Sequence, residues 1–283
     1  MDRPFTIITG VGWRTSHGSA DSPFSFTSPT VKANIGAWTA YELLASGFPV
    51  MLIARRKERL STLQSALLTC FPGSLVEIAA LDVTDVNAVA SWAESLPSMS
   101  NLAFVHSVGL SSGEYDVPNN NPYLPIAETP SNLPIAETEA VVKSLLLMTQ
   151  GLLPHFRQCN GGRIVVISSM SGIRPFPFGF SHASAKAALH HATRSMALEL
   201  HKRNILVSEV APGIVDTGLY DNPYVKASVD HIAQAFGYDY STSSLPMMSP
   251  RAVAEAVSLC LKSEGHVLSI NIVANGQWPH LGA

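Results

Sequence analysis

His182 and Lys186 stand four residues apart at the start of a segment with helical periodicity, so both side chains share one face of the expected helix. A neutral imidazole can donate or accept a proton near pH 7, which makes His182 a chemically sensible general acid or base. The ammonium group of Lys186 lowers the pKa of the imidazole and weakens it as an acid. His182 is therefore either a proton-transfer residue or a polar pocket residue. His190 and His191 are expected on the helix surface or at an interface.

A second candidate site lies after the first expected strand, Phe5–Thr9, where a glycine-containing turn is divided by residues 13–33. Glycines at such a turn let backbone N–H groups approach a pyrophosphate, and the N-terminus of the following helix adds a favourable field. The residues of this divided loop are Gly10, Gly12, Asn34, Ile35 and Gly36. We expect the insertion to be ordered over or beside the phosphates, with Arg14, His17 and Lys32 as additional contacts.

The elements that must position these residues alternate between strand and helix along the chain. The expected strands are Phe5–Thr9, Pro49–Ala54, Val76–Leu81, Leu102–Ser107, Arg163–Ser168, Leu206–Val210 and Val267–Val273. The expected helices are Ala37–Ser46, Lys57–Thr69, Val86–Leu96, Glu137–Phe156, His182–His201 and Pro250–Lys262. Strands that are apolar on both faces and separated by helices are typical of a parallel sheet covered on both sides. The pattern predicts one α/β domain over residues 1–283, a Rossmann-like, doubly wound three-layer fold with ligands beyond the carboxyl ends of its strands.

Two further segments interrupt the alternation. Residues 110–138 are rich in Pro and Asn and contain most of a tandem repeat, LPIAETPSN (Leu124–Asn132) followed by LPIAETEAV (Leu133–Val141). Loops of this length in a compact domain are typically lids over a site or mobile surface. The second segment is residues 219–248. With the Phe residues before the long helix, its aromatic residues predict an apolar or aromatic pocket; the set is Phe176, Phe178, Phe180, Tyr220, Tyr224, Phe236, Tyr238 and Tyr240.

Short motifs after later strands complete a resemblance to the short-chain dehydrogenase/reductase family. They are Asp82-Val83, His106-Ser107-Val108-Gly109 and Pro212-Gly213-Ile214-Val215-Asp216-Thr217. The glycine loop of the family reads TGxxxGxG; Gly10 and Gly36 match its first and last glycines, whereas Asn34 replaces the middle one. The resemblance extends from Ile7 to Gly276, outside the two insertions, and it implies that residues 219–248 form the substrate lid.

The resemblance implies a dinucleotide cofactor held by residues from several motifs. Asp82 and Val83 would contact the adenine, and Ile214 and Thr217 would meet the nicotinamide end. The implied cofactor-binding residues are Gly10, Gly12, Asn34, Ile35, Gly36, Arg55, Arg56, Asp82, Val83, Ser107, Gly109, Lys186, Pro212, Gly213, Ile214 and Thr217. Arg55 and Arg56 follow the second strand, where an acidic residue would bind a ribose 2′-hydroxyl. Cations there suit a 2′-phosphate, so NADP(H) is favoured over NAD(H); the alternative is a solvated arginine pair.

The catalytic residues implied by the resemblance are Ser169, His182 and Lys186. Ser169 would hydrogen-bond the substrate oxygen, and Lys186 would hold the ribose. His182 occupies the place of the family's catalytic tyrosine, and Val141 or a neighbour stands where the family has an asparagine. These departures leave three hypotheses: a carbonyl reductase or alcohol dehydrogenase, a non-redox enzyme such as a lyase, isomerase or cyclase, and a catalytically silent protein that binds a dinucleotide or a partner.

Composition limits the partners. The net charge is −3 and there is no basic run, which argues against nucleic acid, and no apolar run is long enough to span a membrane. Three scattered cysteines without metal-ligand spacing predict reduced thiols, a cytoplasmic protein and no metal site. The family pairs its two long helices across a twofold axis. The apolar and small residues of Val141–Leu153 and Ala187–Leu200 therefore predict a homodimer or homotetramer acting on a small-molecule substrate.

Overall fold

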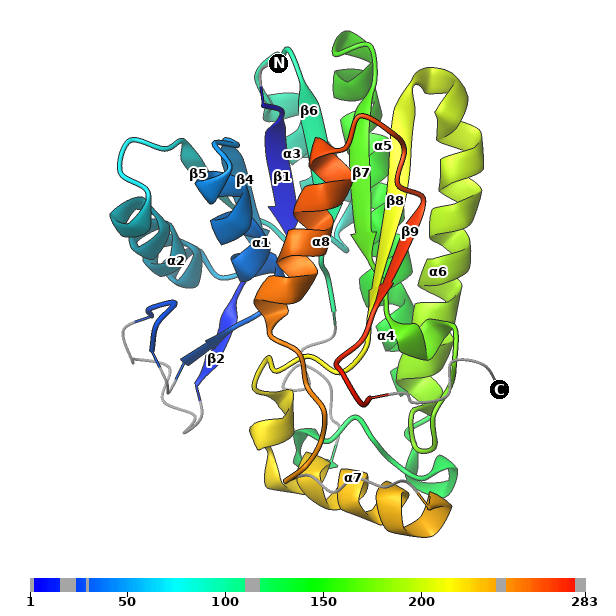
Figure 1. Ribbon diagram of the computed structural model, residues 1–283. Helices are drawn as coiled ribbons and strands as arrows, with labels where there is room; N and C mark the ends of the chain where they lie inside the picture. The colour runs from blue at the N-terminus through cyan, green and yellow to red at the C-terminus, as the bar shows by residue number, and fades with distance from the viewer. Residues whose placement is uncertain (1–2, 16–23, 29–30, 110–117, 238–242, 278–283) are drawn as a thin grey trace.

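The computed structural model describes residues 3–15, 24–28, 31–109, 118–237 and 243–277. A parallel sheet of seven strands, in the order β5-β4-β1-β6-β7-β8-β9, forms its centre (Figure 1). The strands are β1 (Phe5–Thr9), β4 (Val50–Ala54), β5 (Val76–Ala80), β6 (Leu102–His106), β7 (Gly162–Ile167), β8 (Ile205–Pro212) and β9 (Ser269–Ile272). Because β1 pairs with β4 on one side and β6 on the other, the strand order reverses beside β1. Ligands bind at this point of doubly wound sheets.

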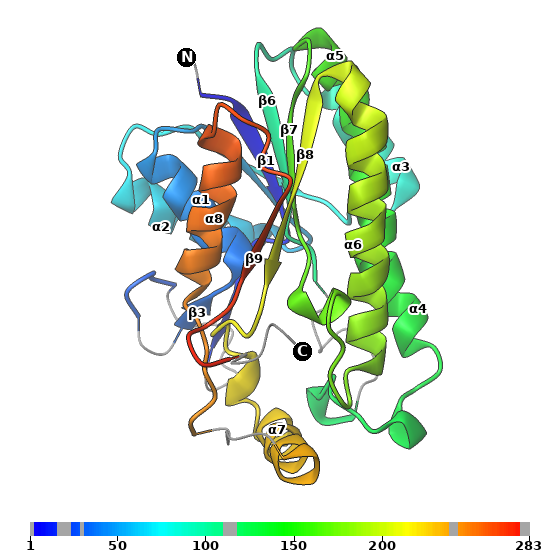
Figure 2. The same cartoon turned by 45° about the vertical axis from the view of Figure 1, so that its right-hand side comes forward.

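Helices cover both faces of the sheet, so the expected three-layer fold is confirmed (Figure 2). One layer holds α1 (Ile35–Ala45), α2 (Lys57–Cys70) and α8 (Pro250–Lys262); the other holds α3 (Val86–Ser95), α5 (Ser144–Gln158) and α6 (Phe180–Leu200). Successive residues of the central strand point to opposite layers: Ile7 packs with α5 and α6, and Ile8 packs with α1 and α8. This alternation requires strands that are apolar on both faces.

The first insertion contains regular structure. Its ends form an antiparallel pair of strands, β2 (Trp13–Thr15) and β3 (Val31–Ala33), with Arg14 opposite Lys32. A row of aromatic rings with centroids 4.7–5.2 Å apart joins the insertion to α1 and α2; its members are Trp13, Phe24, Phe26, Trp38, Tyr41 and Phe71. The described parts of the insertion thus pack on the core through aromatic contacts that no periodicity in the sequence reveals. His17 lies outside the described residues.

The second insertion ends in a helix that begins before the expected Glu137. Helix α4 (Leu133–Thr138) starts with Pro134 in its first turn, a favourable place for proline, and runs through a π-helical turn (Glu139–Lys143) into α5. The first copy of the repeat instead forms a short 3-10 turn, Ile126–Glu128. The expected lid contains helix α7 (Pro223–Phe236), which lies beyond the carboxyl ends of the strands (Figure 1). No helix in the described part of the chain is long and apolar enough to cross a membrane.

Candidate active site

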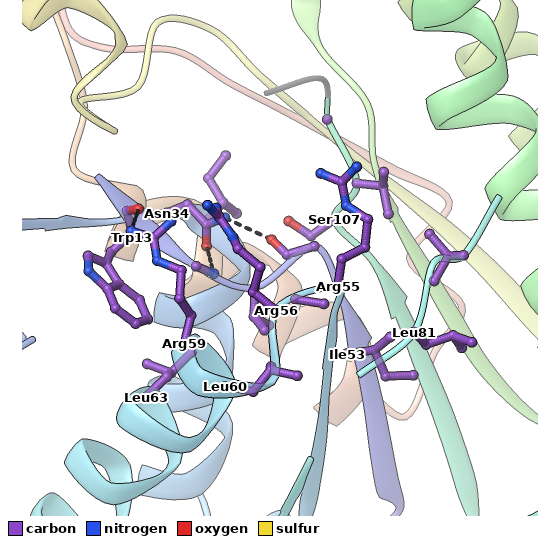
Figure 3. A pocket seen from close by; sticks show the side chains of 18 of the residues that line it. Trp13, Asn34, Ile53, Arg55, Arg56, Arg59, Leu60, Leu63, Leu81 and Ser107 are labelled. Carbon is purple, nitrogen blue, oxygen red and sulfur yellow. Dashed lines mark hydrogen bonds between the residues drawn. The ribbon is translucent and has the colours of Figure 1, made fainter. Parts of the chain in front are cut away.

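A cavity of about 460 Å³ opens beyond the carboxyl ends of β1, β4 and β6 (Figure 3). Most of the predicted cofactor-binding residues line it: Gly10, Gly12, Asn34, Ile35, Arg55, Arg56, Asp82, Val83, Ser107, Gly109 and Thr217. Gly36 lies behind the loop, and Pro212, Gly213 and Ile214 line the adjoining cavities described below. The topology therefore gathers residues that are more than 200 positions apart at one edge of the sheet.

Two glycines of the divided loop are required by close backbone approach. Gly10 has a φ of +75°, and a Cβ there would lie 2.2 Å from the carbonyl oxygen of Ser107. A Cβ on Gly36 would lie 2.9 Å from the carbonyl oxygen of Gly10. Both positions exclude a side chain, and the loop leaves its backbone on the cavity wall, as a pyrophosphate site needs.

Asn34 joins the two halves of the loop across the insertion (Figure 3). Its Nδ2 donates a hydrogen bond to the carbonyl oxygen of Gly10 at 2.8 Å. Its Oδ1 accepts from the N–H groups of Gly12 at 3.1 Å and Ala37 at 2.9 Å, which also caps α1. The residue that replaces the middle glycine of the family motif thus holds the turn together by its side chain.

Four arginines line the cavity: Arg14, Arg55, Arg56 and Arg59. Arg59 was not predicted from the sequence; its guanidinium stacks over the Trp13 ring at 4.4 Å and donates to the Trp13 carbonyl oxygen at 3.1 Å. Lys32, another expected phosphate contact, forms two ion pairs: its Nζ lies 2.7 Å from Asp216 and 3.1 Å from Asp221 and ties the insertion to the loop after β8.

A second cavity, of about 250 Å³, brings Ser169, His182 and Lys186 together. Ser169 follows β7, and its Oγ accepts hydrogen bonds from the N–H group of Ser171 at 3.2 Å and from the Ser171 hydroxyl at 2.8 Å. His182 and Lys186 come from the first turns of α6. Lys186 is buried and its Nζ donates to the carbonyl oxygen of Ile167 at 3.4 Å. Pro212, Gly213 and Thr217 line the same cavity.

Burial controls the charges of this cavity. Burial and, as the smaller cause, Lys186 together lower the pKa of His182 to about 3, so the imidazole is neutral at pH 7. The sequence indicated the direction through Lys186, but burial is the larger cause. Burial also lowers the pKa of Lys186 to about 8, against the opposing effect of Glu137 and Glu209. Lys186 therefore holds its proton at pH 7 and can lose it under mildly alkaline conditions.

Glu137 is a residue of this cavity that the sequence analysis missed. It lines the wall with His182 and Lys186 and is only 4% exposed. Burial raises the pKa of its carboxyl group to about 7, although Lys186 opposes the shift. The only sequence signal for this residue was its place in the second copy of the repeat. The first copy has the same sequence pattern and is exposed, so the pattern does not indicate burial.

His106, at the start of the expected His-Ser-Val-Gly motif, faces the core. Its Nε2 lies 2.9 Å from the Ser144 hydroxyl, and burial, together with the smaller effect of Lys186, lowers its pKa to about 3. Ser144 begins α5 directly after the π-helical turn, and Val141 is buried within that turn. His106 thus anchors the helix in the region where the family has its asparagine.

A third cavity, of about 130 Å³, adjoins Ser169 and His182 and is mainly apolar. Its apolar and aromatic residues are Tyr123, Met170, Phe176, Ile214, Tyr220, Val229, Ile232 and Leu245. Of the predicted aromatic set, Phe176 and Tyr220 line this cavity. Phe180, Tyr224 and Phe236 are about half exposed, Phe178 stacks on His231, and Tyr238 and Tyr240 lie outside the described residues.

The sequence analysis also missed Tyr123 and Gln277, which line the third cavity. Tyr123, from the second insertion, shares a hydrogen bond of 3.1 Å with the hydroxyl of Tyr220. Gln277 is buried, and its Oε1 accepts from the N–H group of Ile214 at 2.8 Å, which fixes the loop after β8. Neither residue belongs to a motif. Each reaches the cavity on a loop that returns from a distant part of the chain, so the local sequence does not indicate the contact.

Comparison with known proteins gives one family. The model of the short chain dehydrogenases matches residues 31–224. An NADP-dependent 3-hydroxy acid dehydrogenase from Salmonella typhi is 26% identical over 246 residues, which cover 85% of this chain and 90% of that protein. A very-long-chain 3-oxoacyl-CoA reductase from Coccidioides immitis is 23% identical over 256 residues, covering 84% and 70%.

Solved structures have the same fold. An NADPH-bound short chain oxidoreductase from Pseudomonas aeruginosa PAO1 that contains an atypical catalytic center is similar with a TM-score of 0.72 and 20% identity, over 100% of both chains. L-Sorbose reductase from Gluconobacter frateurii, complexed with NADPH and L-sorbose, gives a TM-score of 0.70 and 21% identity, over 97% of this chain and 96% of that chain. With a family model that matches more than half of its residues, this chain belongs to the short-chain dehydrogenase family.

Proposed function

We propose that the protein is an NADP(H)-dependent oxidoreductase that interconverts a carbonyl group and an alcohol on an apolar or aromatic substrate. The observation that carries the proposal is the continuity of the three cavities. The first and second share residues on their walls, including Arg14, Ile35 and Thr217, and the second and third share Ser169 and His182. A dinucleotide in the first cavity therefore reaches the catalytic residues, and a substrate in the third meets it there.

The residues present fit such a cofactor. The glycine loop offers bare backbone at the start of α1, and the arginines after β4 offer cations for a 2′-phosphate. The NADPH-bound oxidoreductase from Pseudomonas aeruginosa and the NADP-dependent dehydrogenase from Salmonella typhi support the choice of cofactor. When bound, the nicotinamide supplies two-electron redox chemistry at the substrate carbon.

The residues of the chain orient the substrate oxygen. The Ser169 hydroxyl and the neutral imidazole of His182 are hydrogen-bond donors on the shared wall of the two smaller cavities. Lys186 holds a positive charge beside them at pH 7. Charge that develops on the substrate oxygen during reduction is therefore met by preorganised donors and by an ammonium group. Phe176, Tyr220 and their apolar neighbours exclude water from the carbon that reacts.

The proposal is tested by following nicotinamide absorbance with a panel of apolar and aromatic ketones and alcohols. We expect oxidation of NADPH with at least one ketone, or reduction of NADP⁺ with the matching alcohol. Binding of NADPH without turnover on any member of the panel would contradict a redox role and favour the non-redox or silent hypotheses.

The nucleotide preference provides a sharper prediction. Arg55→Asp, or the same change at Arg56, should weaken NADPH binding by about 10-fold or more while it leaves NADH binding little changed, because a charge-assisted contact with the 2′-phosphate is lost. Glu58→Gln, in the first turn of α2, is the control for a general change at this surface. Dissociation constants from fluorescence titration measure the effect. Equal affinity of the unaltered protein for both nucleotides would contradict it.

We also propose that two or four copies of the chain associate through α5 and α6. Leu146 on α5 is 51% exposed and Leu198 on α6 is 81% exposed, although burial of each side chain is favourable. Light scattering should give a mass two or four times 30.2 kDa. Leu198→Asp should lower this mass. Leu75→Asp, at a 52% exposed position before β5, should not. A mass of 30.2 kDa at all concentrations would refute the association.

A further inference from the structure

The nine-residue duplication places two equivalent glutamates in different surroundings. In both copies the threonine after the glutamate donates its hydroxyl hydrogen bond to the proline carbonyl four residues earlier, at 3.0 Å in the first copy and 2.7 Å in the second. The two copies therefore share this side-chain hydrogen bond beside the glutamate. Glu128 nevertheless lies exposed on a 3-10 turn, whereas Glu137 is 4% exposed on α4 and lines the catalytic cavity.

The carboxyl group of Glu137 has an incomplete set of partners. Its Oε2 is buried and has no hydrogen-bond partner among the described residues. Burial of a carboxylate is costly, so the protonated form is favoured and the pKa rises to about 7, although Lys186 opposes the shift. Glu137 also lines the cavity with His182 and Lys186, which places its side chain beside a molecule bound there.

Several charged or titratable groups surround Glu137. Those on the same cavity wall are His182 and Lys186 of α6, Tyr123, Tyr220 and Arg14. The π-helical turn after α4 contributes Glu139 and Lys143, whose charged atoms pair with each other at 4.0 Å. Glu209 and His106 act on the cavity through Lys186. Lys186 is thus the cation that stabilises the Glu137 carboxylate, and the neutral His182 cannot replace Glu137 as an acid at pH 7.

We infer that Glu137 is a catalytic residue of the proposed reaction, in which its carboxyl group exchanges a proton with the substrate oxygen. The inference rests on the proposed function. During reduction, the hydrogen and electron pair for the carbonyl carbon come from reduced nicotinamide. The O–H bond of the carboxyl group breaks as the O–H bond of the alcohol forms, and the carboxylate left beside Lys186 regains a proton from water. During oxidation the carboxylate accepts the hydroxyl proton.

The two directions of the reaction should depend oppositely on pH. Below pH about 7 the carboxyl group is protonated and ready to donate, so the rate of reduction should fall as the pH rises through this value. Oxidation needs the carboxylate, so its rate should rise over the same range. Lys186, with its pKa lowered to about 8, adds a separate dependence at higher pH that does not require Glu137 to titrate.

The test compares Glu137→Gln with Glu128→Gln, its counterpart in the first copy of the repeat. Glutamine keeps the shape of the side chain and removes the titrating proton. We expect Glu137→Gln to lower kcat for reduction by about 10²-fold, to abolish the pH dependence near 7 and to leave NADPH affinity within about twofold. Glu128→Gln should leave all three properties unchanged. Glu137→Asp, which keeps a titrating carboxyl group, should recover part of the activity and of the pH profile.

A measurement without turnover separates this inference from the proposed function. Infrared difference spectra of the protein alone, recorded between acidic and alkaline pH, should contain the band of a protonated carboxyl group that titrates near pH 7. The band should be absent in Glu137→Gln and present in Glu128→Gln. Absence of the band from the unaltered protein, or a Glu137→Gln variant with normal kcat and pH profile, would overturn the role of Glu137. A titrating band in a protein that never turns over nicotinamide would overturn the proposed function, and the proton transfer with it.

Discussion

His182→Ala is expected to lower kcat for carbonyl reduction by about 10²-fold while NADPH affinity stays nearly constant. Burial and Lys186 keep the imidazole neutral, so its contribution is a hydrogen bond to the substrate oxygen that strengthens as negative charge develops. Loss of one such donor typically costs about 10²–10³-fold in kcat. Steady-state kinetics and a nucleotide titration measure the two quantities.

His191→Ala is the matched control, since this residue lies on the same helix outside the three cavities. His182→Tyr should preserve or raise activity on simple ketones, because tyrosine is the residue of the family motif. If His182→Ala leaves turnover unchanged, the imidazole has no part in the reaction. If His182→Tyr creates reductase activity that the unaltered protein lacks, a non-redox function gains support.

Gly10→Ala should destabilise the fold by about 2–5 kcal/mol and abolish measurable NADPH binding. The left-handed backbone costs about 1–2 kcal/mol for a residue with a Cβ, and overpacking against the Ser107 carbonyl adds about 1–3 kcal/mol. The same contact would push apart the loop and β6, which form the cavity wall. Chemical denaturation and nucleotide titration measure the losses.

Gly73→Ala separates the two causes. Gly73 also has a left-handed φ of +82°, but a Cβ there would meet nothing within 4 Å. This variant should lose only about 1–2 kcal/mol and bind NADPH normally. Equal losses of stability in both variants would show that the backbone conformation, and not the contact with Ser107, limits the residue at position 10.

The sheet and its covering helices were predictable because their apolar residues recur with a local period. Strand β1 and helix α8 have the predicted bounds, and the other strands and sheet-covering helices differ mainly at their ends. The hairpin of the first insertion was not predictable, since Phe26 packs on Trp38 and Tyr41 across a gap in sequence that no periodicity spans. Tertiary packing, and not local propensity, determines this part of the fold.

The residues of the site also divide into those that the sequence predicted and those that depend on tertiary packing. Ser169, His182 and Lys186 were found because they lie in one motif, and the structure places them in one cavity. Glu137 was missed because the repeat gives it the same local sequence as Glu128, and only the packing of α4 on α6 buries one of the two. The sequence predicted a pocket with aromatic residues. It could not predict which of the aromatic residues line the pocket, because this depends on the side of the lid on which each ring lies.

The arginines of the nucleotide cavity have a kinetic consequence. Arg14, Arg55, Arg56 and Arg59 line this cavity with Asp82 as its one acidic residue among the described lining residues, on a chain whose net charge is −3. A positive recess on a protein of negative net charge attracts polyanions to one place, and such steering raises association rates at low ionic strength. At about 0.15 M salt the Debye length of about 8 Å confines the attraction to molecules already near the rim. Ionic strength is therefore expected to act mainly on the rate of nucleotide entry.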